Sequence, residues 1–280
     1  MDNYQLTQDQ ITAYGVCLRT EEHTPSTIEK YLRDTRAFAV WLEGRPVTRE
    51  LAAEWRDRLL SSGHKPSTVN SMLAAVNGLF RFLGWGIRVK FLKVQRRLFR
   101  DQSRELTRGE YDLLVNTARA AGKERLALLM EAVCATGVRV SEVKYLTVEA
   151  AQCGRAEIAL KGKIRMILLP NKLCRKLLKY ARKQKIASGE IFLTRSGRSL
   201  SRRQIWAEMK QLCKATGVAS EKVYPHNLRH LFARTFYQAC KDIARLADVL
   251  GHSSIETTRI YLLTSGAEHQ RQLDRLGLVS

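Results

Sequence analysis

The second half of the chain carries side chains suited to phosphoryl transfer. A phosphodiester is an anion, and attack on its phosphorus adds negative charge to the non-bridging oxygens. Arginine suits that charge because its planar guanidinium stays protonated and donates two parallel hydrogen bonds. A tyrosine oxygen can act as the nucleophile, while imidazole and ammonium groups move protons. Such a set predicts cleavage and rejoining of DNA strands without a metal. The candidates are Arg139, Lys161, His226, Arg229, His252 and Tyr261.

Spacing supports a shared site for two of these side chains. His226 and Arg229 are three residues apart, so on a helix they share one face and can address one phosphate. A lone arginine in so basic a chain is more often a surface charge, and a lone histidine is more often a capping or core residue. The pair therefore carries more weight than either residue alone. Arg139 is the expected second arginine of the phosphate clamp.

A second pattern brings His252 near Tyr261. Gly251 is expected to end a helix, because glycine readily adopts the left-handed conformation that closes helices. Ser253 or Ser254 then caps the next helix, which carries Tyr261 about two turns further on. A phenol with a pKa near 10 needs positive charge or a base nearby to act as a nucleophile. The two side chains are therefore expected to converge on one site.

Lys161 falls in the turn of a predicted β-hairpin. Two short apolar runs, 156–160 and 164–169, flank Lys161-Gly-Lys163, and glycine favours the turn. A lysine at such a turn is by default solvated. Its flexible ammonium can nevertheless reach a cleft and protonate a departing 5′ oxygen. Lys163 is the competitor for this role.

The first hundred residues have helical patterns and predict a small bundle. Ser26-Thr-Ile-Glu29 has the form of a capping box, and Pro66 opens a helix that Gly84 stops. A second capping box, Thr107-Arg-Gly-Glu110, begins a larger domain that is mainly helical. Its helical patterns run through 113–118 and 126–135, and a short strand is expected at 191–193. The bundle helices are expected near 6–18, 26–42, 48–60 and 66–83.

A basic segment joins the two regions. Its apolar residues show no clean period, and such a run is often an edge strand or a solvated loop. Its position between two helical regions favours an interdomain linker lying against the phosphate backbone of DNA. The expected division is a helical domain at 1–87, a linker at 88–104 and a catalytic domain at 105–280. The linker's expected DNA-binding residues are Arg88, Lys90, Lys93, Arg96, Arg97 and Arg100.

Composition agrees with a polyanionic partner. The 280 residues include 48 Lys+Arg against 27 Asp+Glu, a net charge of +21. Each phosphate that the protein neutralises releases counterions, so this excess favours nucleic acid. The six cysteines are scattered without a C-x-x-C pair, which indicates thiols in a reducing cytoplasm. No secretory signal opens the chain, and no apolar run approaches the roughly 20 residues that span a membrane.

With these motifs in order, the sequence resembles the tyrosine recombinases of the phage-integrase family, in particular Xer-like enzymes and small mobile-element integrases. The resemblance covers nearly the whole chain and assigns Glu142 an accessory role beside the first arginine. The turn at Lys161 is one residue shorter than the Gly-Lys-Gly-Asn-Lys form of Xer-type members, so Lys161 and Lys163 remain alternatives. The matching motifs are Thr136-Gly-Val-Arg-Val-Ser-Glu142, Leu160-Lys-Gly-Lys-Ile-Arg165, Pro225-His-Asn-Leu-Arg-His230, Leu250-Gly-His-Ser-Ser254 and Thr258-Arg-Ile-Tyr261.

The resemblance implies a two-domain DNA clamp, with a SAM-like core-binding bundle and a catalytic domain that is mainly α with a small β-hairpin. Tyr261 would form a 3′-phosphotyrosyl link and release a 5′ hydroxyl, with no metal or nucleotide cofactor. Four subunits, either copies of this chain or a sister recombinase as well, would exchange strands through a Holliday junction at the nucleoid. The segment after Tyr261 would reach a neighbouring subunit.

Other classes explain fewer of these residues. A type IB topoisomerase or telomere resolvase uses the same residue set, and strand exchange between two DNA molecules would distinguish a recombinase. A catalytically silent DNA-binding regulator needs only the basic surface and the helices. A metal-dependent nuclease would need a carboxylate cluster with metal-ligand spacing, which does not accompany the motifs.

Overall fold

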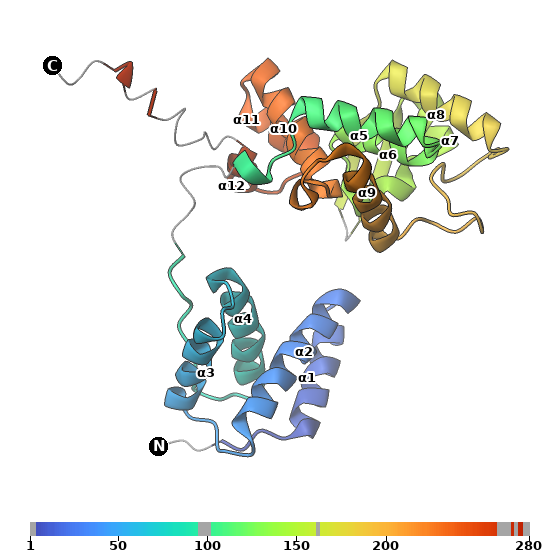
Figure 1. Ribbon diagram of the computed structural model, residues 1–280. Coiled ribbons are helices and arrows are strands. Elements are labelled where there is room, and N and C mark those ends of the chain that lie inside the picture. The colour runs from blue at the N-terminus through green and yellow to red at the C-terminus, as the bar shows by residue number, and fades with distance from the viewer. Residues whose placement is uncertain (1–3, 95–101, 161–162, 262–269, 272–273, 277–280) are drawn as a thin grey trace. The chain divides into compact units, whose positions relative to one another are not determined.

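The computed structural model describes residues 4–94, 102–160, 163–261, 270–271 and 274–276. The fold is mainly α-helical with one small two-stranded antiparallel sheet, as the sequence predicts. The chain forms two compact units, Met1–Arg96 and Arg97–Ser280, which are described separately (Figure 1). Within the described ranges, no helix has both the length and the apolar character needed to cross a membrane.

The first unit is a four-helix bundle around an aromatic core. Phe38 is fully buried and meets the rings of Trp55 and Phe80 edge-on, at centroid distances of 5.0 and 5.8 Å. Such edge-to-face pairs stabilise a core beyond the area that they bury. The helices are α1 (Gln8–Thr20), α2 (Pro25–Leu42), α3 (Arg49–Ser61) and α4 (Pro66–Phe82).

The start of α2 corrects one expectation. The capping box predicted at Ser26 is absent, because the helix already begins at Pro25 and Ser26 lies inside it. Proline has a fixed φ and no N–H, so it suits the first helical position and sets the start itself. The Thr24 side chain makes no capping hydrogen bond to the backbone. Helix α4 begins with Pro66 in the same way.

The basic segment after α4 follows that helix in an extended form. The side-chain amide of Asn77 bonds both the N–H and the C=O of Val89, each at 2.9 Å. The side-chain amide of Asn70 likewise bonds the N–H of Leu92 at 2.8 Å and its C=O at 2.9 Å. Val89 is buried while its basic neighbours are exposed, so the segment has a strand-like alternation here, contrary to the expected lack of a clean period. The exposed basic residues are Arg88, Lys90 and Lys93, while Arg96, Arg97 and Arg100 lie outside the described residues.

The second unit is built around α6 (Glu124–Thr136), which contacts α5, α8, α9 and α10 (Figure 1). Its residues are buried on nearly every side, as expected of a helix that is apolar all round. The capping box at Thr107 and Glu110 is confirmed at the start of α5. The other α-helices described in this unit are α5 (Arg108–Ala120), α7 (Val148–Cys153), α8 (Asn171–Lys183), α9 (Arg202–Thr216), α10 (Pro225–Cys240), α11 (Ile243–Leu250) and α12 (Ile255–Thr258).

The predicted β-hairpin is confirmed as β1 (Arg155–Leu160) and β2 (Lys163–Leu168). The strand expected at 191–193 is wrong, since only isolated bridges pair Thr147 with Glu190 and Leu193 with Ser199. Ile191 and Phe192 are apolar because they fill the core between the bridges.

Candidate active site

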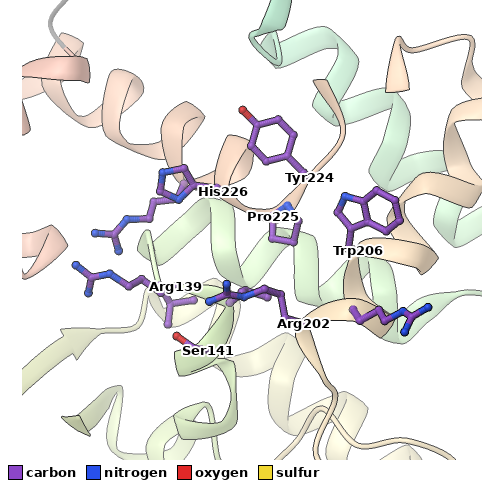
Figure 2. A pocket seen from close by; sticks show the side chains of 11 residues that line it. Arg139, Ser141, Arg202, Trp206, Tyr224, Pro225 and His226 are labelled. Carbon is purple, nitrogen blue, oxygen red and sulfur yellow. The ribbon is translucent and has the colours of Figure 1, made fainter. Parts of the chain in front are cut away.

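A pocket of about 650 Å³ opens beside the start of α10 (Figure 2). Two predicted residues, Arg139 and His226, reach it from different elements, and the buried Arg229 lies at its wall. Positive and aromatic side chains make up much of the remaining lining. The other lining residues are Val138, Val140, Ser141, Arg202, Arg203, Trp206, Tyr224 and Pro225.

The loop that carries Arg139 is shaped by the end of α6. Gly137 closes the helix in the left-handed conformation, with φ +66°. A Cβ at Gly137 would lie 2.5 Å from the Phe232 ring, so the close approach also requires glycine. Glu142 then accepts hydrogen bonds from the Arg139 backbone N–H at 2.8 Å and from its Nη1 at 2.9 Å. Glu142, the predicted accessory residue, thus holds both the main chain and the side chain of Arg139 in place.

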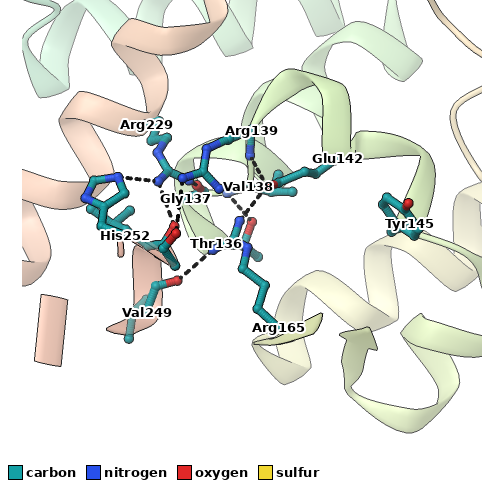
Figure 3. Close-up of polar contacts among 12 residues, drawn as sticks. Thr136, Gly137, Val138, Arg139, Glu142, Tyr145, Arg165, Arg229, Val249 and His252 are labelled. Atoms are coloured by element: carbon teal, nitrogen blue, oxygen red, sulfur yellow. Dashed lines mark hydrogen bonds and ion pairs between the residues drawn. The ribbon is translucent and has the colours of Figure 1, made fainter. Parts of the chain in front are cut away.

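Glu142 is shared between two guanidinium groups (Figure 3). Its side chain is 2% exposed and forms a second ion pair with Arg165, which β2 supplies. Burial alone would raise the pKa of Glu142. The hydrogen bonds from Arg139 and the charge of Arg165 outweigh burial and lower that pKa instead. Glu142 is therefore a carboxylate that holds two arginines in place.

Arg229 is the most deeply buried cation of the site, at 1% exposure. It donates hydrogen bonds to the carbonyl of Gly137 and, at 2.8 Å, to the carbonyl of Leu250 (Figure 3). These carbonyls belong to the closing turns of α6 and α11, where the helix dipoles favour a cation. Burial, and then the charge of Arg139, lowers the pKa of Arg229 to about 10. At neutral pH the guanidinium remains charged.

His252 lies between Arg229 and Thr258. Gly251 ends α11 as predicted, with φ +63°, and Ser254, one of the two expected caps, begins α12. His252 Nε2 lies 2.9 Å from Arg229 Nη2, and Nδ1 lies 2.8 Å from the Thr258 hydroxyl. Arginine can only donate, so Nε2 accepts and Nδ1 carries the proton that it donates to Thr258. Burial, then the charge of Arg229, lowers the pKa of His252 to about 4, so the ring is neutral.

Tyr261 is 4% exposed and lies in a row of aromatic rings. Its ring stacks on His252 at 6.1 Å and meets the edge of His230 at 4.8 Å. His230 in turn contacts the His226 ring at 4.6 Å. Burial, followed by the neighbouring His226, lowers the pKa of His230 to about 3. Two neutral imidazoles thus hold the phenol beside the charged Arg229.

His226 stands at the mouth of the pocket, with part of its side chain exposed to solvent. Enclosure by the surrounding protein lowers its pKa, and the charges of Arg229 and Arg139 lower it further. The imidazole is therefore neutral at neutral pH, with ring nitrogens able to accept or donate a proton.

The predicted catalytic residues other than Lys161 all lie in this one unit. Lys161 lies outside the described residues, and for Lys163 only its backbone place at the start of β2 is described. Three contributors were missed: Arg165, His230 and Thr258. His230 had a usable signal, since it lies one helical turn after His226. Arg165 lies on the same inward face of β2 as the buried Ile167, but a charged residue on an inward strand face is not expected from pattern alone.

Comparison with known proteins identifies the family. Residues 104–267 match the phage integrase family, and residues 11–86 match the N-terminal SAM-like domain of phage integrases. The chain is 31% identical over 282 residues to the tyrosine recombinase XerC of Roseiflexus castenholzii, a match that covers 90% of this chain and 88% of the relative. It therefore belongs to the phage integrase family.

Within that family the chain is a tyrosine recombinase, an enzyme of site-specific DNA recombination. A second relative with that activity in its name is the tyrosine recombinase XerA of Thermococcus kodakarensis. It is 28% identical over 270 residues, covering 94% of this chain and 93% of the relative. These relatives favour the predicted recombinase over the two alternative classes, a type IB topoisomerase or telomere resolvase and a catalytically silent DNA-binding regulator.

Solved structures of recombinases share the fold. A lambda integrase (75–356) dimer bound to a COC′ core site matches with a TM-score of 0.75 and 19% identity, over 94% of this chain and 96% of that chain. A lambda integrase tetramer bound to a Holliday junction gives a TM-score of 0.74 and 19% identity, over 93% and 78% of the two chains. At such low identity these likenesses establish the fold alone.

Proposed function

We propose that Tyr261 is the nucleophile of this recombinase and that Arg139 and Arg229 bind the scissile phosphate. The phenol oxygen attacks phosphorus, the bond from phosphorus to the 5′ oxygen breaks, and a 3′-phosphotyrosyl link remains. The observation that carries this proposal is the packing of Tyr261 against His252 and His230 beside the buried Arg229.

The electrostatics of the site support a role in transition-state stabilisation. The imidazoles of His226, His230 and His252 all have lowered pKa values, so the fixed positive charge resides on the arginines. Preorganised donors in a buried site stabilise charge that develops during reaction more strongly than water does. Arg229 is held in a fixed orientation by two carbonyls at the wall of the pocket.

Proton transfer requires groups other than the two arginines. The phenol must lose a proton as it attacks, and the 5′ oxygen must gain one as it leaves. His226, which lines the pocket, is proposed to accept or donate one of these protons. Lys161 is proposed as the acid for the 5′ oxygen on the strength of the family motif, with Lys163 as the alternative.

Binding of the duplex is proposed to involve both units. Arg88, Lys90 and Lys93 are exposed basic residues on the segment beside α4, and Arg202 and Arg203 line the pocket. The lambda integrase structures named above are bound to a core site and, as a tetramer, to a Holliday junction. We infer a four-subunit synapse on DNA for this chain, in mobile-element integration, excision or resolution, with this chain or a sister recombinase as partner.

A nicked suicide substrate tests the covalent step. The nick lets the short 5′ strand diffuse away, so a phosphotyrosyl adduct accumulates and survives a denaturing gel. Wild-type protein should form the adduct, and Tyr261→Phe should bind the same DNA without forming it. An adduct of normal yield from the Phe variant would remove Tyr261 from the role.

A further inference from the structure

Arg165 lies at the junction of three parts of the active site. It projects from β2 opposite Ile158, on the inward side of the hairpin, and its side chain is 15% exposed. Its Nη2 group pairs with Glu142, and its Nη1 group donates to the carbonyl of Val249 at 3.2 Å (Figure 3). Arg165 therefore joins the hairpin to the loop of the first arginine and to the last turn of α11.

The charges around Glu142 do not cancel. One buried carboxylate faces two guanidinium groups, so the three side chains leave one net positive charge. Arg139 is the more exposed of the two, at 36%, and it lines the pocket. Arg165 is absent from the described lining of that pocket. The outer arginine thus faces the substrate, and the inner one faces the protein.

We propose that Arg165 is a positioning residue: it provides the permanent counter-charge for Glu142, so that the charge of Arg139 stays available to the scissile phosphate. Without it, Glu142 would neutralise Arg139, or would take up a proton and release the loop. This inference rests on the proposed role of Arg139 in phosphate binding.

The turn before His252 is fitted to Arg165 as well. A Cβ at Gly251 would collide with the Cδ of Arg165, so the backbone of the turn passes directly over the arginine stem. The same guanidinium adds to the positive potential that lowers the pKa of His252. Arg165 therefore acts on both sides of the site, through Glu142 on one side and the Val249–His252 turn on the other.

The decisive measurement is the single-turnover rate constant for cleavage of a nicked substrate at saturating protein. Arg165→Met should react roughly 10- to 100-fold more slowly, as expected for misplaced catalytic groups. Arg165→Lys should recover only part of the rate, because a point charge cannot serve Glu142 and Val249 together. Arg175→Met, an exposed arginine of α8, is the matched control and should react normally.

A double variant separates charge from structure. Glu142→Gln with Arg165→Met restores one net positive charge at the site, so it should cleave faster than Arg165→Met alone. A purely structural role would lower the fraction of active protein and leave the rate constant unchanged. An unchanged rate constant for Arg165→Met, or a double variant slower than the single one, would overturn the proposal.

Acid unfolding tests the counter-charge without any DNA. The charged groups that bond Glu142 are Arg139 from its own turn and Arg165 from β2. Glu142 is ionised in the folded protein, and the stability it contributes is lost as pH falls through its folded pKa. Removal of Arg165 raises that pKa, so Arg165→Met should lose stability at a higher pH than wild type. Coincident acid profiles would refute the counter-charge role, whereas a wild-type protein that forms no adduct would refute the proposed function instead.

Discussion

Replacement of Gly137 by alanine should be far more damaging than the same change at an open helix end. Gly137 has φ +66°, and a Cβ there would lie 2.5 Å from the Phe232 ring and 3.0 Å from Leu250. The left-handed backbone costs an L-residue about 1–2 kcal/mol, and forced overpacking adds about 1–3 kcal/mol. The free energy of unfolding should therefore fall by about 2–5 kcal/mol.

Gly217 provides the matched control. It ends α9 with φ +67°, but nothing lies within 4 Å of its Cβ position, so Gly217→Ala should show only the backbone cost of about 1–2 kcal/mol. Thermal unfolding of the full chain measures both variants, with roughly 2–4 °C expected per kcal/mol. Equal melting temperatures for the two variants would refute the packing argument. Gly137→Ala should also slow cleavage, because the Gly137 carbonyl accepts a hydrogen bond from Arg229.

Three further results are expected. Thr258→Val removes the partner of His252 Nδ1 and should slow cleavage roughly 10-fold, while Thr258→Ser keeps the hydroxyl and the rate; equal rates for the two variants would contradict the hydrogen-bond assignment. His252 has a folded pKa of about 4 against an ordinary 6.5, so the unfolded chain binds its proton more readily. Stability should therefore be complete above about pH 6.5 and fall toward pH 4, with a shallower fall in His252→Gln, as thermal unfolding across that range would reveal. Deletion of the residues after Gly266 should leave single-site binding in a gel shift nearly intact and impair recombination between two sites, and a truncated chain that recombines normally would exclude an exchange role for the tail.

The elements that could be predicted are those whose local signals agree with the tertiary fold. Thr107 and Glu110 form the expected capping box, in which each side chain bonds the backbone N–H of the other residue. At Ser26 a proline one residue earlier takes over the helix start. Ile191 and Phe192 suggest a strand that the structure does not contain, because a short apolar run is typical both of a buried strand and of buried irregular backbone.

The site shows the same division. His226, Arg229 and the Gly251 turn lie in short segments where spacing alone fixes geometry. Arg165 meets Glu142 and Val249 only after the hairpin and α11 have folded against the arginine loop. Contacts between residues so far apart in the chain leave no periodic signal, and a buried arginine departs from the apolar pattern that marks an inward strand face.

The hydrogen bonds of Arg229 determine which inactive variant can be used to trap a DNA complex without disturbing the fold. Its guanidinium joins the closing turns of two helices, so truncation leaves carbonyls in the core without donors, at about 1–3 kcal/mol each. An alanine variant would thus mix a chemical defect with a folding defect. Tyr261→Phe loses one oxygen and keeps the ring that His252 and His230 contact. A DNA complex of the phenylalanine variant should therefore keep the active-site geometry of the wild-type enzyme. A complex of a variant without Arg229 should have an altered pocket.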